Sequence, residues 1–153
     1  MSFDTTAGTR GARQPTTTVL RWVNKLAARR IRRTGKFMGF NALILTTIGR
    51  KSGVERTNPV GWFPGKDGSW VIVASANGAA GNPAWYYNIA AHPDKVRIEV
   101  ENRKIAVIAE QLHGVERAAA WEQIIADVPR FARYQERTDR ELPVIRLTPR
   151  SDA

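Results

Sequence analysis

A short basic segment containing two glycines is the first candidate for chemistry in this chain. The sequence TTIGRKSGVERTNP, residues 46–59, follows an apolar run and contains the cluster Arg50, Lys51, Ser52, Gly53 and Arg56. Because glycine reaches backbone conformations with positive φ, Gly49 and Gly53 predict a tight turn between two strands. Such a turn is either a solvated basic hairpin or an anion site built from backbone N–H groups, the serine hydroxyl and the cations.

Several other kinds of site are excluded by the residue types present. A P-loop requires a glycine directly before its lysine, and Arg50 occupies that position. The chain has no cysteine and only two histidines, so we expect no metal site. The G-x-S-x-G sequence of a serine hydrolase is also absent.

A second candidate segment combines small residues with the aromatic start of a helix. VIVASANGAAGNPAWYY, residues 71–87, reads as a strand, a loop of small side chains and a helix in which Asn82 is the N-cap and Pro83 the first residue. Such a helix start leaves free N–H groups and the positive end of a dipole, and small side chains let a planar ring approach the backbone. Aromatic residues on a helix more often belong to the core. Together, the two segments would suit a ligand with a planar ring and an anionic tail.

With a third segment, these two resemble a known family. TTIGRKSGVERTNP, VIVASANGAAGNPAWYYNIAAHP and RYQERTDRELPVIRL keep the order and spacing found in the deazaflavin-dependent nitroreductases and quinone reductases, which are split-barrel oxidoreductases that use coenzyme F420. The resemblance covers roughly residues 36–149. It implies hydride transfer from reduced F420 to a small-molecule acceptor such as a quinone, a conjugated enone or a nitro compound.

The resemblance also implies roles for individual residues. In family members the basic turn binds the phosphate and glutamyl tail, and the matching residues here are Arg50, Lys51, Ser52, Gly53 and Arg56. The strand end and helix start contact the deazaflavin ring, and the matching residues are Val73, Ala74, Ser75, Ala76, Asn82, Pro83, Ala84 and Trp85. Tyr134 matches an aromatic residue of the ring or substrate pocket. Tyr134 and Ser75 are the catalytic candidates, because either could donate a hydrogen bond or proton to the acceptor.

Other positions of the family pattern are structural or altered. Asn58 is expected to be a turn amide, and Asp139 a partner of Arg140 or of the basic turn. Phe131 stands where the nitroreductases of the family place a tyrosine, and Arg137 where another aromatic residue is common. Gly61 occupies a position that is often aromatic. These departures imply an acceptor pocket with fewer hydroxyls and less bulk, and an acceptor that is larger or differently charged than a nitroimidazole.

Three alternatives remain open at this point. The chain could be a split-barrel oxidoreductase that binds FMN, which has a phosphate but no glutamate tail. It could also bind and sequester F420 without catalysis. A third alternative is nucleic-acid binding through residues 19–36, although no motif for groove reading or base stacking supports it.

The elements that must position these residues predict an α+β fold. We expect a split β-barrel of about six mainly antiparallel strands with flanking helices. Alternating or β-branched apolar runs predict strands over residues 42–48, 57–63, 70–74, 96–100, 105–109 and 142–147. Helical spacing predicts helices over residues 84–91 and 115–127.

The net charge of +10 is concentrated before this domain, since the first 36 residues hold nine Lys/Arg and one Asp. We expect a flexible basic tail over residues 1–15, a basic amphipathic helix over 16–35 and the cofactor-binding split barrel over 36–153. The helix could pack on the barrel or lie on the anionic inner face of the cell membrane, with Trp22 as an interfacial anchor. Without a signal peptide or an apolar span, a cytoplasmic location is expected.

Overall fold

The computed structural model describes residues 3–12, 17–37 and 40–150. Within these ranges it contains four α-helices, eight strands and two 3₁₀ turns. The helices are α1 (Thr17–Thr34), α2 (Ala84–Ala91), α3 (Gly114–Asp127) and α4 (Arg130–Arg137). The strands are β1 (Lys36–Phe37), β2 (Phe40–Ile48), β3 (Glu55–Gly61), β4 (Phe63–Pro64), β5 (Trp70–Val73), β6 (Val96–Val100), β7 (Arg103–Gln111) and β8 (Val144–Pro149).

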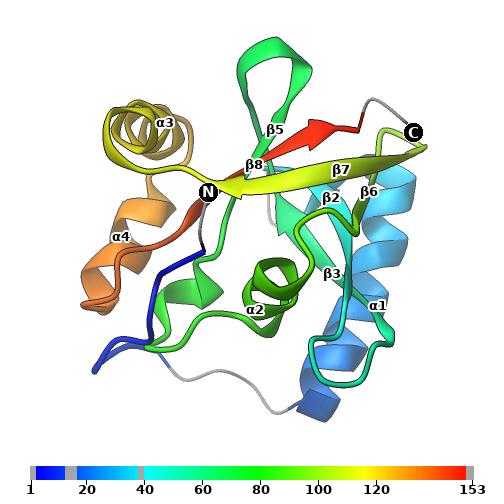
Figure 1. The fold of residues 1–153 in the computed structure, drawn as a ribbon, viewed down its shortest axis with the longest axis horizontal. Coiled ribbons are helices and arrows are strands. Elements are labelled where there is room, and N and C mark those ends of the chain that lie inside the picture. Colours follow the sequence, from blue (N-terminus) through cyan, green and yellow to red (C-terminus); the bar gives the residue numbers. More distant parts are fainter. Residues whose placement is uncertain (1–2, 13–16, 38–39, 151–153) are drawn as a thin grey trace.

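The strands form one curled antiparallel sheet. Its order is β1-β2-β6-β7-β8-β5-β4, and β3 pairs with β2 outside that path. The longest pairing joins β2 and β3 from Ala42 opposite Gly61 to Ile48 opposite Glu55, and therefore ends at the basic turn. Figure 1 shows α2 inside the curve of the sheet, with α1 on one side and α3 and α4 on the other. The α+β split-barrel prediction is confirmed, as a half-barrel of eight rather than about six strands.

Both faces of the central strands are covered, which explains their continuous apolar sequences. In β5, Trp70 and Ile72 pack in the core around α2, whereas Val71 and Val73 pack in the core beside α3 and α4. Side chains alternate between faces along a strand, so a run of four apolar residues serves both cores at once. The strand thus connects the two packing layers and leads directly into the loop that precedes α2.

Helix α1 packs against β1, β2 and β3 through a narrow part of its apolar surface. Ala27 and Ile31 are buried, and Ile31 contacts Ala42 and Ile44 of β2. Val23 and Leu26 of the same helix are 47% and 60% exposed. No described helix combines the length and the hydropathy needed to cross a membrane.

The N-cap predicted for one helix was wrong, and another helix was not predicted. Helix α2 begins at Ala84 with Pro83 as its N-cap and no side-chain cap, because the Asn82 side chain makes hydrogen bonds elsewhere. Helix α4 was not predicted at all. Pro129 is its N-cap, and the eight residues of α4 bury Phe131 and Tyr134.

The first residues of the chain lie against the loop before α2 (Figure 1). We call residues 3–12 the N-terminal segment. Its contacts include hydrogen bonds from Thr5 N to Tyr86 Oη (3.0 Å), Gly8 N to Ala80 O (2.7 Å) and Ala12 N to Gly78 O (3.0 Å). A flexible tail is expected here because Gly, Thr and Arg give no periodic pattern of apolar residues. Main-chain hydrogen bonds do not depend on such a pattern, so the sequence does not indicate these contacts. The division of the chain near residues 15 and 35 stays a prediction.

Candidate functional site

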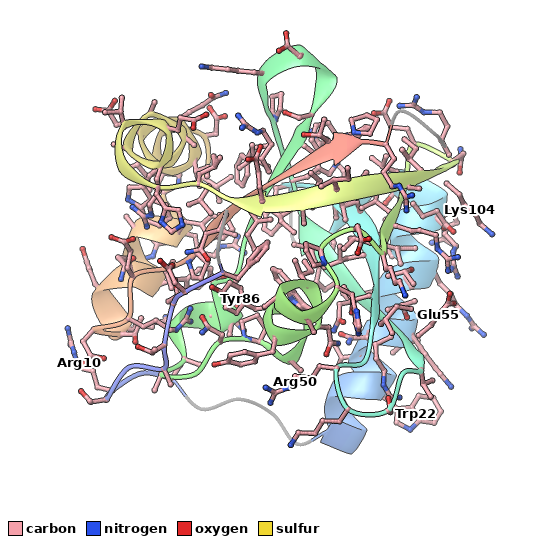
Figure 2. All side chains as sticks on the ribbon, viewed as in Figure 1. Arg10, Trp22, Arg50, Glu55, Tyr86 and Lys104 are labelled. Atoms are coloured by element: carbon pink, nitrogen blue, oxygen red, sulfur yellow. The ribbon has the colours of Figure 1, made fainter. Side chains whose placement is uncertain are left out.

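A cleft lies between α1, the β2–β3 turn and the start of α2. Its volume is about 990 Å³. Figure 2 shows Arg50 beside α2 on one side of this region and Trp22 on α1 on the other. Six of the residues predicted to bind the cofactor line it: Arg50, Lys51, Ser52, Arg56, Ala84 and Trp85. The cleft therefore joins the basic turn to the first turn of α2.

The basic turn is closed by its own main-chain hydrogen bonds. Gly49 N donates to Val54 O and Gly53 N donates to Gly49 O, both at 2.8 Å, and Gly53 has a φ of 70°. Val54 N donates to Ser52 Oγ at 3.2 Å. Within the described structure, the amides of Lys51 and Ser52 make no hydrogen bond. Two N–H groups and the serine hydroxyl proton thus remain for an anion.

Helix α2 fixes the position of the turn through one buried amide. Arg50 N donates to Asn88 Oδ1 at 3.0 Å, and Asn88 Nδ2 donates to Thr47 Oγ1 at 3.1 Å. The Arg50 guanidinium lies 4.7 Å from the centre of the Tyr87 ring, a cation–π distance. Sequence reasoning missed Asn88. Its signal is a polar residue in an otherwise apolar helix, where a buried amide must find partners.

The cations of the turn are not neutralised by the protein. Lys51 and Arg56 make no ion pair or hydrogen bond through their side chains to any described residue. Glu55 lies between them in sequence but pairs with Arg97 at 2.5 Å. The wall formed by the turn therefore keeps its positive potential in the cleft, which fits the phosphate or carboxylate groups of a ligand.

The loop between β5 and α2, residues 74–82, has an unusual backbone. Ala76 and Asn77 have φ values of 46° and 56°, and Gly78 follows at 81°. Left-handed conformations at non-glycine residues cost free energy and persist only where neighbouring structure imposes them. We call residues 74–82 the ring loop, after the role that the family resemblance implies.

Arg140 imposes the shape of the ring loop from inside the protein. Its side chain is 2% exposed. Its hydrogen bonds run to Ala74 O (2.9 Å), Ser75 O (2.9 Å), Ala79 O (3.1 Å) and Asn82 Oδ1 (2.7 Å). No described carboxylate lies within ion-pair distance, and burial lowers the pKa of Arg140. A single guanidinium thus connects both ends of the loop.

Asp139 does not pair with Arg140 or with the basic turn, so that prediction was wrong. Its carboxylate accepts hydrogen bonds from the Thr9 hydroxyl, from Thr9 N at 2.8 Å and from Arg10 N at 3.3 Å. These bonds lower the pKa of Asp139 to about 2, the Thr9 hydroxyl contributing most. Asp139 therefore holds the N-terminal segment against the ring loop.

Tyr134 belongs to a row of aromatic rings beside the ring loop. Phe131 lies 6.2 Å from Phe40, 5.7 Å from Phe63 and 5.4 Å from Tyr134, measured between ring centres. A Cβ placed on Gly61 would lie 2.2 Å from a carbon of Phe40. Phe40 therefore occupies the space that a side chain at Gly61 would take, and the predicted loss of bulk in the acceptor pocket stays a prediction.

Arg137, another departure from the family pattern, covers this row. Its guanidinium lies 5.6 Å from the Tyr134 ring centre, and Nη1 donates to Asn77 O at 3.3 Å. Tyr134 is 8% exposed, and its hydroxyl makes no hydrogen bond within the described structure. The hydroxyl thus remains able to donate a hydrogen bond to a ligand.

Not all predicted site residues line the cleft. Those outside its lining are Gly53, Val73, Ala74, Ser75, Ala76, Asn82, Pro83 and Tyr134. The Asn82 side chain is occupied by internal hydrogen bonds to Arg140, Thr5 and Tyr87. Asn58, expected in a turn, lies on β3 and lines the cleft. Among the described residues, no cluster of three or more His, Cys, Asp or Glu could hold a metal.

Comparisons with known proteins agree on one family. The model of the family described as F420H(2)-dependent quinone reductase matches residues 18–149. An F420H(2)-dependent quinone reductase of Mycobacterium tuberculosis is 37% identical over 113 residues, which are 71% of this chain and 74% of the relative. A putative one from that species is 34% identical over 108 residues, 71% of this chain and 89% of the relative. The structure of an F420-H2 dependent reductase (FDR-A) has a TM-score of 0.62 at 33% identity, covering 69% of this chain and 92% of its own.

Proposed function

Because the chain belongs to the F420H(2)-dependent quinone reductase family, we propose that it transfers a hydride from reduced coenzyme F420 to an electrophilic small molecule. A quinone is the first candidate acceptor, and a conjugated enone or a nitro compound are the others. The observation that supports this most is the cleft at the basic turn. It presents unneutralised cations and two free amides directly beside the first turn of α2.

The residues present fit the anionic part of F420, a deazaflavin with a phosphate and an oligoglutamate tail. We propose that Lys51, Arg56, Ser52 and the free amides bind these groups. Arg50 and Gly53 would shape the turn, Arg50 through Asn88 and Tyr87. The ring would lie against the backbone of Val73–Ala76 and against Pro83, Ala84 and Trp85, with Asn82 positioning the loop. When bound, the reduced cofactor supplies the hydride.

The acceptor needs a hydrogen-bond donor where negative charge develops on its oxygen as it is reduced. Tyr134 and Ser75 are our proposed donors. Tyr134 has a free hydroxyl within the described structure, and Ser75 lies half-buried at the start of the ring loop. The fixed loop reduces the reorganisation needed to orient the ring towards the acceptor.

Turnover tests this proposal directly. Purified protein is mixed without oxygen with reduced F420 and, separately, with a quinone, an enone and a nitro compound, and the absorbance of the oxidised deazaflavin is followed. We expect oxidation in the presence of the quinone. Tyr134→Phe should lower kcat about 10²-fold or more without changing cofactor affinity. Full turnover by Tyr134→Phe with bound cofactor would disprove the role of Tyr134.

Two alternatives give different results when binding of F420 and FMN is measured beside turnover. A non-catalytic protein that sequesters F420 would bind the cofactor tightly but oxidise it with none of the three acceptors. An FMN-dependent enzyme would bind FMN at least as well as F420. The cations of the turn favour F420, because FMN has one phosphate and no further carboxylates for Lys51 and Arg56.

We also propose that α1 contacts the inner face of the cell membrane, in keeping with a cytoplasmic location. Trp22 and Leu26 are 67% and 60% exposed on this helix, and Arg30 and Arg33 lie beside the exposed apolar residues. Exposed apolar residues flanked by cations are typical of helices that bind anionic lipid surfaces. Co-sedimentation with anionic vesicles, weakened in Val23→Ser/Leu26→Ser, would support this; sedimentation equal to that with neutral vesicles would contradict it.

A further inference from the structure

Helix α1 forms the second wall of the cleft and presents a row of cations to it. Trp22, Lys25, Arg29 and Arg32 all line the cleft. Their spacing of three and four residues places them on one face of the helix. Because Ala27 and Ile31 are buried against the sheet, the rotation of the helix about its axis is fixed, and so is the direction of this face.

The charges of this wall are only partly balanced by the protein. Arg32 pairs with Glu99 at 2.7 Å. Lys25 and Arg29 make no ion pair or side-chain hydrogen bond to any described residue. Glu55 is the one carboxylate among the described residues that line the cleft, and it pairs with Arg97. Two unpaired cations of α1 and the two unpaired cations Lys51 and Arg56 of the β2–β3 region therefore line the same cleft.

Cations that line one cleft repel each other, so this arrangement costs free energy unless a ligand carries negative charges between them. A single phosphate at the turn would occupy one wall only. The volume of about 990 Å³ is at the upper end of the range for small-molecule sites and leaves room for much more than a phosphate. A flexible chain with several carboxylates would reach both walls.

We propose that Lys25 and Arg29 bind the distal carboxylates of the cofactor's oligoglutamate tail, so that α1 sets the preference for tail length. This inference rests on the proposed function, because it assumes that F420 binds at the turn. Nucleic acid is a less suitable polyanion here, since Lys25 and Arg29 line the same cleft as the basic turn and the first turn of α2. Arg30 and Arg33 lie outside this cleft on the same helix.

The test measures the affinity of the whole protein for F420 without glutamates, with a short tail and with a long tail, by fluorescence titration. We expect wild-type affinity to rise with tail length. In Lys25→Ala/Arg29→Ala, the affinity for the long-tailed form should fall about three- to tenfold, while that for the form without glutamates stays unchanged. The matched control is Arg30→Ala/Arg33→Ala, which removes the same charge from the same helix outside the cleft. It should retain the wild-type dependence on tail length.

Each outcome separates the two proposals. If wild type binds none of the three forms, the proposed function fails. If all three bind and Lys25→Ala/Arg29→Ala keeps the full dependence on tail length, the role of α1 is wrong. If both double variants lost the same affinity for long-tailed F420, the effect would come from the overall positive charge of α1 and not from binding by Lys25 and Arg29. That result would also overturn the proposed role of α1. Displacement of long-tailed F420 by a short DNA duplex at comparable concentration would favour nucleic acid over the tail.

All four substituted positions are exposed on a helix, where alanine is favourable, so the variants should fold.

Discussion

Arg140 is the residue on which the shape of the ring loop depends most directly. Its guanidinium is buried with no described carboxylate within ion-pair distance. Its N–H groups instead donate hydrogen bonds to carbonyl oxygens of the loop. A planar guanidinium has five N–H donors, so it can donate hydrogen bonds to acceptors that lie in several directions at once. Arg140 does not line the cleft, so we regard it as a positioning residue.

Replacing Arg140 should therefore affect both folding and the site. Arg140→Ala leaves buried carbonyls without donors and should lower the free energy of unfolding by about 2–4 kcal/mol, measured by denaturant titration. Arg140→Lys should recover only part of this loss, because an ammonium group cannot donate hydrogen bonds in the same arrangement as a guanidinium. The Lys variant should also bind F420 more weakly while Arg103→Ala/Lys104→Ala does not. Unchanged stability in Arg140→Ala would contradict this account.

Asp139 gives the attachment of the N-terminal segment a defined pH dependence. Its pKa is about 2 in the folded protein and 3.8 for the ordinary group. Because the folded value is the lower one, the carboxylate stabilises the fold above pH 3.8 and loses this contribution as pH falls through about 2. Wild type should be more stable than Asp139→Asn at neutral pH, and the difference should disappear towards pH 2. A pH-independent difference would show that the carboxylate is not responsible.

At the level of elements, the ring loop is held between α4 on one side and the N-terminal segment on the other. Gly78 lies close to the backbone of α4. A Cβ on Gly78 would lie 2.5 Å from Tyr134 O, and its φ of 81° is unfavourable for any side chain. Gly35 has a similar φ of 73° but open space around it.

These two glycines provide a matched pair of substitutions. Gly35→Ala should cost about 1 kcal/mol for the backbone conformation alone. Gly78→Ala should cost about 2–4 kcal/mol, because the backbone of α4 must also move. Thermal or denaturant unfolding of both variants measures the difference. Equal losses would mean that the ring loop and α4 are not closely packed.

The strands and the basic turn could be predicted because their signals are local. Apolar runs identify β2, β5 and β6, and the glycines around Arg50–Ser52 identify the turn. Helix α4 was missed because it is short and follows a proline. Arg140, Asn88 and the α1 wall could not be predicted, since their partners are distant in sequence: Arg140 donates to a carbonyl 66 residues away. The spacing of charges on α1 indicated an amphipathic helix but not which face meets the cleft.

For the whole molecule, the distribution of positive charge follows from the position of helix α1 on the half-barrel. Helix α1 comes from the basic N-terminal part of the chain, and its position beside β3 brings that charge to the basic turn. Figure 2 shows Lys104 at the tip of the β6–β7 hairpin, away from Arg50, so not every cation of the protein contributes to the cleft. This concentration of charge makes the cleft at the turn the place where we expect F420 to bind.

Fluorescence titration with oxidised F420 and, separately, with FMN tests whether the cleft binds F420. Wild type should bind F420 with a low-micromolar or smaller Kd and bind FMN at least about tenfold more weakly. Lys51→Ala/Arg56→Ala should lose about ten- to a hundredfold in F420 affinity, whereas Arg103→Ala/Lys104→Ala, with the same change of charge, should not. Equal affinity for FMN, or unchanged F420 binding in Lys51→Ala/Arg56→Ala, would contradict the account.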